Sequence, residues 1–135
     1  MRYVLDACAI IALIRKEDGC IQVRQALEVE ENVCFVHALN LCEVYYDCLR
    51  CYGATQTENL LANLNDAGLI IREDMDSDFW KAAGALKTRG RISLADCFAV
   101  ALAEREDAWL LTSDHHEFDP LLATPGFPAK VQFFR

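Results

Sequence analysis

Short apolar segments alternate with helical patterns along nearly the whole chain, and this alternation restricts the fold more than any other feature. Strands are expected at 3–5, 32–39, 68–73, 108–113 and 130–134, the last after a loop carrying Pro120, Pro125 and Pro128. Helices are expected at 8–16, 20–31, 41–52, 55–66, 77–88 and 94–106, with a break at Gly53. We therefore predict an α/β fold of three layers (α/β/α), with a central, mainly parallel sheet of four to five strands.

The composition fits one compact domain over residues 1–135 and excludes several classes of protein. With 53% hydrophobic residues, the chain can build a core, which excludes a disordered protein. The first apolar stretch is too short to span a bilayer and contains an acid, so we expect no membrane association and a cytoplasmic location. The net charge of −8 is atypical of a nucleic-acid binder, so binding RNA would require a local basic patch or a bound cation.

The cysteines indicate reduced thiols. Their number, seven, is odd, and they are scattered through apolar segments, which disfavours a disulfide framework. Cys48 and Cys51 form a C-x-x-C pattern inside a helical segment with no second pair, so two ordinary thiols are favoured over a zinc or redox site. Cys8 is the nearest candidate nucleophile to the first acid, but it has no evident base or positively charged neighbour.

Four acids are expected at one edge of the sheet. Asp6 ends the first strand, inside the apolar run "RYVLDACAIIALI", and Asp114 follows the fourth strand. Glu43 and Asp96 fall in the first turns of the helices that follow the second strand and precede the fourth. Crossover helices run antiparallel to the strands, so their first turns lie at the strands' carboxyl ends, where ligands bind in such sheets.

Helix capping is the alternative explanation for each acid taken alone. Ser93 and Asp96 fit a capping box. Asn40 and Glu43 fit the same pattern, and Asp114 fits the cap of a short turn over "EFDPLL". Two carboxylates about 5 Å apart repel by roughly 3 kcal/mol at an effective dielectric of about 20. Placing an acid at the start of a helix stabilises it by only about 0.3–1 kcal/mol. Four converging carboxylates would therefore need a divalent cation.

The type of ligand favours a particular ion and a particular chemistry. All four acids offer hard oxygen atoms, which favours Mg²⁺, with Mn²⁺ as the alternative, over zinc. His115 and His116 are better explained as solvated surface residues than as ligands. An open, carboxylate-held Mg²⁺ site activates water and binds phosphate oxygens, so the pattern predicts metal-dependent hydrolysis of phosphodiester bonds. The chain has no glycine-rich phosphate loop that would favour nucleoside triphosphates.

A basic loop lies close to the third acid. Lys87, Arg89 and Arg91 precede Asp96 in "LKTRGRIS", and the loop enters the helix that carries this acid. We expect the three basic side chains to hold the phosphate backbone of RNA. The alternative is a solvated basic connector that is flexible at Gly90.

Four segments together resemble the PIN-domain ribonucleases, specifically the VapC-type toxins of bacterial toxin–antitoxin pairs. They are "YVLDACAIIALI", "ALNLCEVYY", "SLADCFAVALA" and "LLTSDHHEFD", and the resemblance runs from residue 3 to about residue 119. It implies a Mg²⁺-dependent endoribonuclease, a small cognate antitoxin that holds the toxin inactive, and a homodimer. It also implies a catalytic metal site supported by Thr112, with Asp119 either assisting or forming an ordinary turn, and with these four acids as ligands: Asp6, Glu43, Asp96 and Asp114.

The chain departs from this family at one place. Many relatives carry Ser or Thr shortly after the first acid, whereas Ala7 and Cys8 stand here, which affects the expected efficiency and metal preference. Two other functions remain open at this point: a catalytically inert PIN-fold module that binds a protein partner, and a housekeeping PIN nuclease. Four intact acids favour an enzyme, and an adjacent antitoxin gene would favour a toxin.

Overall fold

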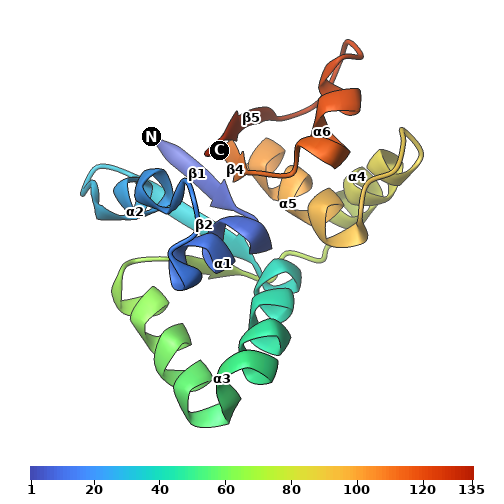
Figure 1. Ribbon diagram of the computed structural model, residues 1–135. Helices are drawn as coiled ribbons and strands as arrows, with labels where there is room; N and C mark the ends of the chain where they lie inside the picture. Colours follow the sequence, from blue (N-terminus) through green and yellow to red (C-terminus); the bar gives the residue numbers. More distant parts are fainter.

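A five-stranded parallel sheet lies at the centre of the protein (Figure 1). In the computed structural model, which describes residues 1–135, the strand order is β3-β2-β1-β4-β5. All neighbouring pairs are parallel, as predicted, and Tyr3 of the central strand pairs with Cys34 on one side and Trp109 on the other. The strands are β1 (Arg2–Leu5), β2 (Val33–His37), β3 (Ile70–Arg72), β4 (Trp109–Thr112) and β5 (Lys130–Phe133).

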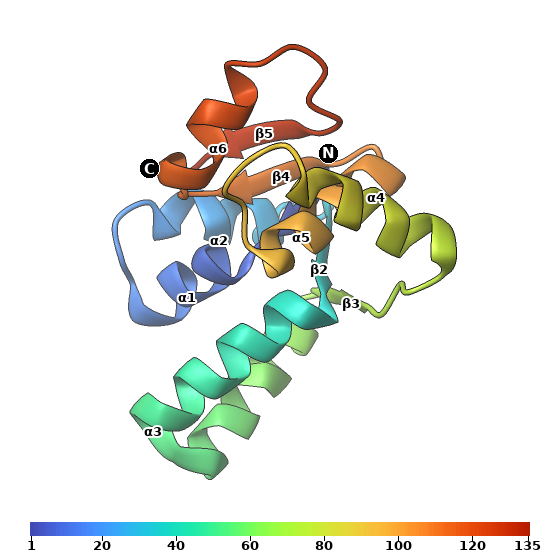
Figure 2. The same ribbon diagram turned by 90° about the vertical axis from the view of Figure 1, so that its right-hand side faces the viewer.

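Six helices cover the sheet, and the prediction of three layers is confirmed (Figure 2). One core lies under α1, α2 and α3, and a second lies under α4, α5 and α6. No helix combines the length and the apolar character needed to cross a bilayer. The helices are α1 (Ala7–Arg15), α2 (Cys20–Glu28), α3 (Ala38–Asp66), α4 (Ser77–Lys87), α5 (Leu94–Arg105) and α6 (His115–Leu122).

Successive residues of the central strands face opposite layers, which explains why these strands are apolar throughout. Val4 and Leu110 belong to the core under α4, α5 and α6. Leu5 and Leu111 belong to the core under α1, α2 and α3. All four side chains are essentially inaccessible to solvent, and burying one such side chain contributes about 1.5–3 kcal/mol. The two cores hold the sheet from both faces. They therefore also determine the position of the residue that follows the carboxyl end of each strand.

Helix α3 projects away from the sheet and returns through a sharp bend (Figure 1). Gly53 sits at the bend with φ 79° and ψ 174°, a conformation that side chains strongly disfavour. The predicted break at this glycine is therefore confirmed. Helix α3 connects β2 to β3, which are neighbours in the sheet. Because of the bend, the second half of the helix returns to the sheet beside the strand from which the first half departs.

The start of α3 differs from the prediction. The helix begins at Ala38, because His37 caps it with Nδ1 accepting a hydrogen bond from the Leu39 N–H at 3.1 Å. The capping box of Asn40 and Glu43, the alternative explanation for this acid, is therefore not formed, and the predicted place of Glu43 in the first turn is wrong. It follows that Glu43 lies in the second turn of the helix and not in the first.

Helix α6 occupies a segment that the sequence predicts to be a loop. Asp114 caps it, with Oδ1 accepting a hydrogen bond from the Glu117 N–H at 3.0 Å. Pro120 lies inside the helix, where it removes only the N–H that would bond back to residue 116, and the helix ends two residues later. A proline near the end of a short helix is therefore compatible with the helical turns before it.

Candidate active site

The carboxyl edge of the sheet gathers three of the predicted acids at helix starts. Asp6 directly follows β1 and caps α1, with Oδ1 accepting from the Ala9 N–H at 2.9 Å. Asp114 follows β4 and caps α6. Asp96 lies in the first turn of α5, behind the capping residue Ser93. Because strand ends and helix starts coincide at this edge, the cap positions are also positions where a ligand can bind.

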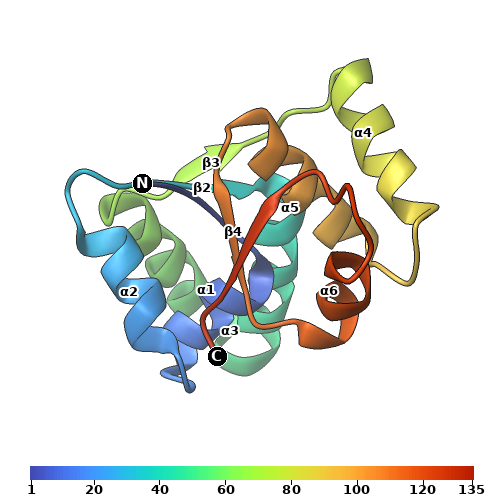
Figure 3. The same ribbon diagram turned by 90° about the horizontal axis from the view of Figure 1, so that it is seen from above.

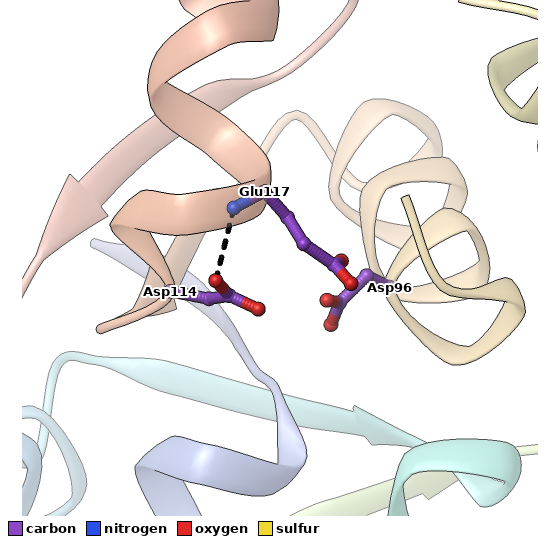
Figure 4. A group of neighbouring side chains, drawn as sticks. All are labelled: Asp96, Asp114 and Glu117. Atoms are coloured by element: carbon purple, nitrogen blue, oxygen red, sulfur yellow. Dashed lines mark hydrogen bonds between the residues drawn. The ribbon is translucent and has the colours of Figure 1, made fainter. Parts of the chain in front are cut away.

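Asp96, Asp114 and Glu117 form a compact group, which we call the carboxylate triad (Figure 4). One oxygen atom from each residue lies within 4.8 Å of the other two. Figure 4 shows Glu117 extending from α6 toward Asp96 on α5. Glu117 is absent from the predicted acids, although its spacing from Asp114 is that of a capping box and could have identified it.

Glu117 reaches the triad because it completes the cap of a different helix. Ser93 Oγ accepts from the Asp96 N–H at 3.2 Å, which is the first half of a capping box at α5. The second half, an acid that accepts from the Ser93 N–H, comes from Glu117 Oε2 at 3.1 Å. Asp96 is therefore free of the reciprocal bond, and its carboxylate faces the other triad members (Figure 4).

Asp6 is the most enclosed of the acids. Its side chain is 1% exposed, and burial raises the pKa of its carboxyl even though hydrogen bonds from Cys8, Thr112 and Ala9 oppose the shift. The charge of Asp114 raises this pKa further. Asp6 lies outside the triad, yet its charge contributes to the raised pKa of a triad member. A buried carboxylate so close to others requires a counter-charge to remain ionised.

Cys8 and Thr112 hold two of the acids in place. The Cys8 thiol donates to Asp6 Oδ1 and Oδ2 at 2.9 and 3.1 Å. Its Sγ accepts from the N–H and the hydroxyl of Ser113, both at 3.4 Å. Thr112 Oγ1 accepts from the Asp114 N–H at 3.1 Å. Burial and then the charge of Asp6 raise the pKa of Cys8 to about 12, so the thiol stays protonated and is unsuited to act as a nucleophile.

Glu43 is partly exposed on the second turn of α3. Burial raises the pKa of its carboxyl, and the charges of Asp6 and Glu117 add to the shift. One turn earlier, Asn40 donates from Nδ2 to the Ala95 carbonyl at 3.2 Å and ties α3 to the start of α5. The Asn40 Oδ1 atom is buried without a hydrogen-bond partner. This contact between α3 and α5 brings Glu43 close enough for the charges of Asp6 and Glu117 to raise the pKa of its carboxyl.

None of these five acids forms an ion pair, although many acids elsewhere in the chain do. Burial raises the pKa of Asp96 to about 9, and a hydrogen bond with Glu117 and the charges of the neighbouring acids add to the shift. The oxygen donors and their uncompensated charge fit a hard divalent cation such as Mg²⁺ or Mn²⁺.

Asp119 and the two histidines lie apart from the triad. Asp119 contacts His115 Nδ1 at 3.1 Å and is exposed. His115 Nε2 is 2.9 Å from the Arg135 carbonyl oxygen, and the ring stacks on Phe133. His116 is exposed, and no hydrogen bond joins either histidine to the five acids. The contacts of His115 with Phe133 and Arg135 fasten α6 to the C-terminal end of the chain.

The cysteine pair on α3 shows no sign of a metal centre. Cys48 is buried, and Cys51 Sγ accepts from Arg15 Nη2 at 3.2 Å. All seven cysteines are free.

The basic loop leads directly into the triad. Lys87, Arg89 and Arg91 are exposed. Lys87 Nζ donates to the Ile92 carbonyl at 2.6 Å, and Arg89 Nη1 donates to the Gly126 carbonyl at 2.9 Å. These two bonds brace the loop, and the Ser93 N–H at its end donates to Glu117 of the triad.

The sequence of residues 3–120 matches the PIN domain family. The match spans most of the chain, and the protein therefore belongs to this family.

Several solved structures share the fold. VapBC2 from Rickettsia felis, solved with a DNA fragment from its promoter, has a TM-score of 0.75, with 20% identity and 98% coverage of both chains. DNA-bound VapBC from Salmonella typhimurium has a TM-score of 0.74, with 10% identity and coverage of 100% of this chain and 99% of the other. The sarcin-ricin loop cleaving toxin VapC20 of Mycobacterium tuberculosis has a TM-score of 0.64, with 15% identity and coverage of 80% and 86%. No match was found among curated protein sequences.

Proposed function

We propose that the protein is a divalent-cation-dependent endoribonuclease and the toxin of a toxin–antitoxin pair. One observation carries the proposal: five acids share one edge of the sheet, and no cationic side chain pairs with any of them. Membership of the PIN domain family and the shared fold with VapC and VapBC proteins support it.

The acids have distinct roles in this proposal. The carboxylate triad holds the ion, Mg²⁺ or Mn²⁺, and Asp6 and Glu43 complete its surroundings. A bound ion supplies a water of lowered pKa and neutralises phosphate charge during hydrolysis. Cys8 keeps the Asp6 carboxylate oriented through two hydrogen bonds, and Thr112 fixes the backbone at Asp114.

RNA binding is assigned to the basic loop. Lys87, Arg89 and Arg91 hold the phosphate backbone beside the acids, which compensates locally for the net charge of −8. Replacing all three with Ala should weaken RNA binding and flatten its dependence on salt, because fewer counterions are then released. Unchanged affinity and salt dependence would remove these residues from the proposal.

The acidic site also suits an inhibitory partner. A small antitoxin that inserts a basic side chain among the acids would supply the missing counter-charge and exclude the metal ion. We further propose that the chain forms a homodimer, as the resemblance to VapC-type toxins implies, and that it acts in the cytoplasm.

Cleavage of RNA by the purified protein tests the proposal. The wild-type chain should cleave RNA with Mg²⁺ or Mn²⁺ and not with chelator, and Asp96→Asn should abolish cleavage. Asp74→Asn is the matched control, since Asp74 is a partly buried acid that arginines already neutralise. RNA left intact with both ions would favour an inert protein-binding module. Cleavage without an adjacent antitoxin gene would favour a housekeeping nuclease.

A further inference from the structure

The basic loop runs along one face of α6 toward the carboxylate triad. At its near end, Ser93 donates to Glu117 Oε2. Farther away, the backbone at Gly90 passes α6 so closely that a Cβ atom there would lie 3.4 Å from Leu121 Cδ2. Glu117 and Leu121 are four residues apart and therefore share a face of the helix. Figures 2 and 3 show this loop, between α4 and α5, lying beside α6.

A cavity opens at the far end of this loop. Its volume is about 350 Å³, which reaches the range of about 300–1,000 Å³ typical of sites for small ligands. Arg89 forms one wall and bonds across to the Gly126 carbonyl. The cavity is lined by Arg89, Leu121, Thr124, Pro125 and Gly126. Its lining thus combines a guanidinium group, an apolar side chain, a hydroxyl and an exposed stretch of backbone.

We propose that this cavity binds one unpaired nucleotide of the RNA, next to the scissile phosphate held at the triad. The inference rests on the proposed nuclease function and names a subsite of that function. The guanidinium of Arg89 offers a positive charge for a phosphate and a flat surface on which a base can stack. Leu121 offers an apolar contact for the base, and Thr124 offers a hydroxyl for its edge.

The distance along α6 agrees with this assignment. Four helical residues separate Glu117 from Leu121, which corresponds to about 6 Å along the helix axis. Stacked nucleotides in a strand are spaced by about 3.4 Å. The cavity therefore lies one or two nucleotides from the triad, with the basic loop between them to neutralise the backbone.

The shape of the site selects against a duplex. A base can enter a cavity only when it is turned out of its stack and is free of a pairing partner, as in loops, bulges and single strands. The loop is held by three bonds, from Lys87, Arg89 and Ser93, so the cavity exists before RNA binds. The enzyme should therefore prefer unpaired segments even where the scissile phosphate alone would be accessible in a helix.

An RNA decamer with a single abasic nucleotide moved along its length tests the assignment. Binding is measured by fluorescence anisotropy in the cleavage-deficient Asp96→Asn background. One position of the abasic nucleotide should weaken binding by roughly 5- to 100-fold, the range that a stacked base contributes. Adding Arg89→Ala, or Thr124→Tyr to fill the cavity, should remove this position-specific loss. Arg24→Ala, at an exposed arginine of α2, is the matched control and should preserve it.

Two results would overturn the inference while leaving the nuclease proposal intact. The first is an abasic profile that is unchanged by Arg89→Ala and by Thr124→Tyr in a protein whose wild type cleaves RNA. The second is equal weakening at every position after Arg89→Ala, which would make Arg89 a simple phosphate contact. A wild-type chain that neither binds nor cleaves RNA would instead overturn the nuclease proposal itself.

Discussion

Two regions of the molecule concentrate acids and surround them with opposite environments. Near the end of α5, Arg105 bonds both oxygens of Asp76 at 2.7 and 2.8 Å and also contacts Asp74 at 2.9 Å. Arg72 bonds both oxygens of Asp74 at 2.8 and 2.9 Å. We call these residues the arginine-paired region. At the carboxyl edge of the sheet, in contrast, five acids have no cationic partner.

The pKa values of the two regions move in opposite directions. Hydrogen bonds from Arg105 lower the pKa of Asp76 to about 2. Burial alone would raise the pKa of Asp74, but hydrogen bonds from Arg72 and Arg105 outweigh it and lower the value. The pKa of Asp96 rises instead, mainly through burial. The comparison teaches that a high density of acids does not by itself indicate a metal site, whereas a missing counter-charge does.

The largest expected contrast between the regions is in the rate of RNA cleavage. Glu117→Gln keeps an oxygen acceptor for the Ser93 N–H but removes one charge from the triad. It should lower the cleavage rate by about 100-fold or more, because even residues behind a metal ligand contribute roughly 10- to 100-fold. Asp76→Asn should leave the rate unchanged. Initial rates on a labelled RNA at saturating Mg²⁺ measure both, and equal losses would contradict the distinction.

The second contrast is in the stability of the metal-free protein. Asp74→Asn should destabilise it by about 1–3 kcal/mol, because charged hydrogen bonds to two arginines are weakened. Asp96→Asn should stabilise it by on the order of 1 kcal/mol, because it removes the cost of burying an ionisable carboxyl beside other acids. Urea unfolding in the presence of chelator measures both changes. A loss of stability in Asp96→Asn would show that the acids are already compensated within the chain.

The third contrast is in the dependence of stability on pH. Because the pKa of Asp96 is raised to about 9, the folded chain binds more protons than the unfolded chain from about pH 4 to that value. The stability of the metal-free protein should therefore fall as pH rises through this window. The lowered pKa of Asp76 acts only in acid, where its contribution is lost as pH falls toward 2.

Melting temperatures in chelator from about pH 5 to about pH 8.5, a range inside the window set by the raised pKa of Asp96, measure this effect. The wild type should lose stability across the series, and Asp96→Asn should flatten the slope. Asp76→Asn should leave the slope unchanged. A wild-type slope that persists in Asp96→Asn would assign the titration to another group.

The smallest expected effect concerns Cys8. Cys8→Ser retains a donor toward Asp6 and should leave the affinity for Mg²⁺ nearly unchanged. Cys8→Ala removes the donor and should weaken binding of the ion by about 10-fold, the lower end for contacts that orient a ligand. Isothermal titration calorimetry with Mg²⁺ and Mn²⁺ measures the change. A serine variant as weak as the alanine variant would indicate a requirement for sulfur.

The sequence predicts the sheet, most helices and three acids at helix starts because these features depend on local patterns. Asp6, Asp96 and Asp114 follow strand ends or begin helices, and parallel topology alone brings such positions to one edge. The position of Glu117 depends on α6, a helix in a segment that the sequence predicts to be a loop because it contains Pro120. It also depends on a hydrogen bond from Ser93, the residue that caps α5. Contacts of this kind are tertiary, so no window of neighbouring residues contains them.

The register of α3 was misplaced for a related reason. The strand was expected to continue to residue 39, whereas it ends at His37, whose ring caps the helix through a contact two residues away. The cavity beside Arg89 likewise depends on a bond to Gly126, which is distant in sequence. Local propensity thus identifies the helices and strands, whereas side-chain contacts between two elements determine the final arrangement of the residues in the site.

The central place of β1 has a consequence for synthesis of the protein. Its neighbours are β2, made early, and β4, made near the end of the chain. Asp6 therefore emerges from the ribosome long before Asp114 and Glu117, and the partial chain holds no complete set of carboxylates. Under the proposed function, a nascent chain lacks a complete site until Asp114 and Glu117, in the final fifth of the sequence, have been made.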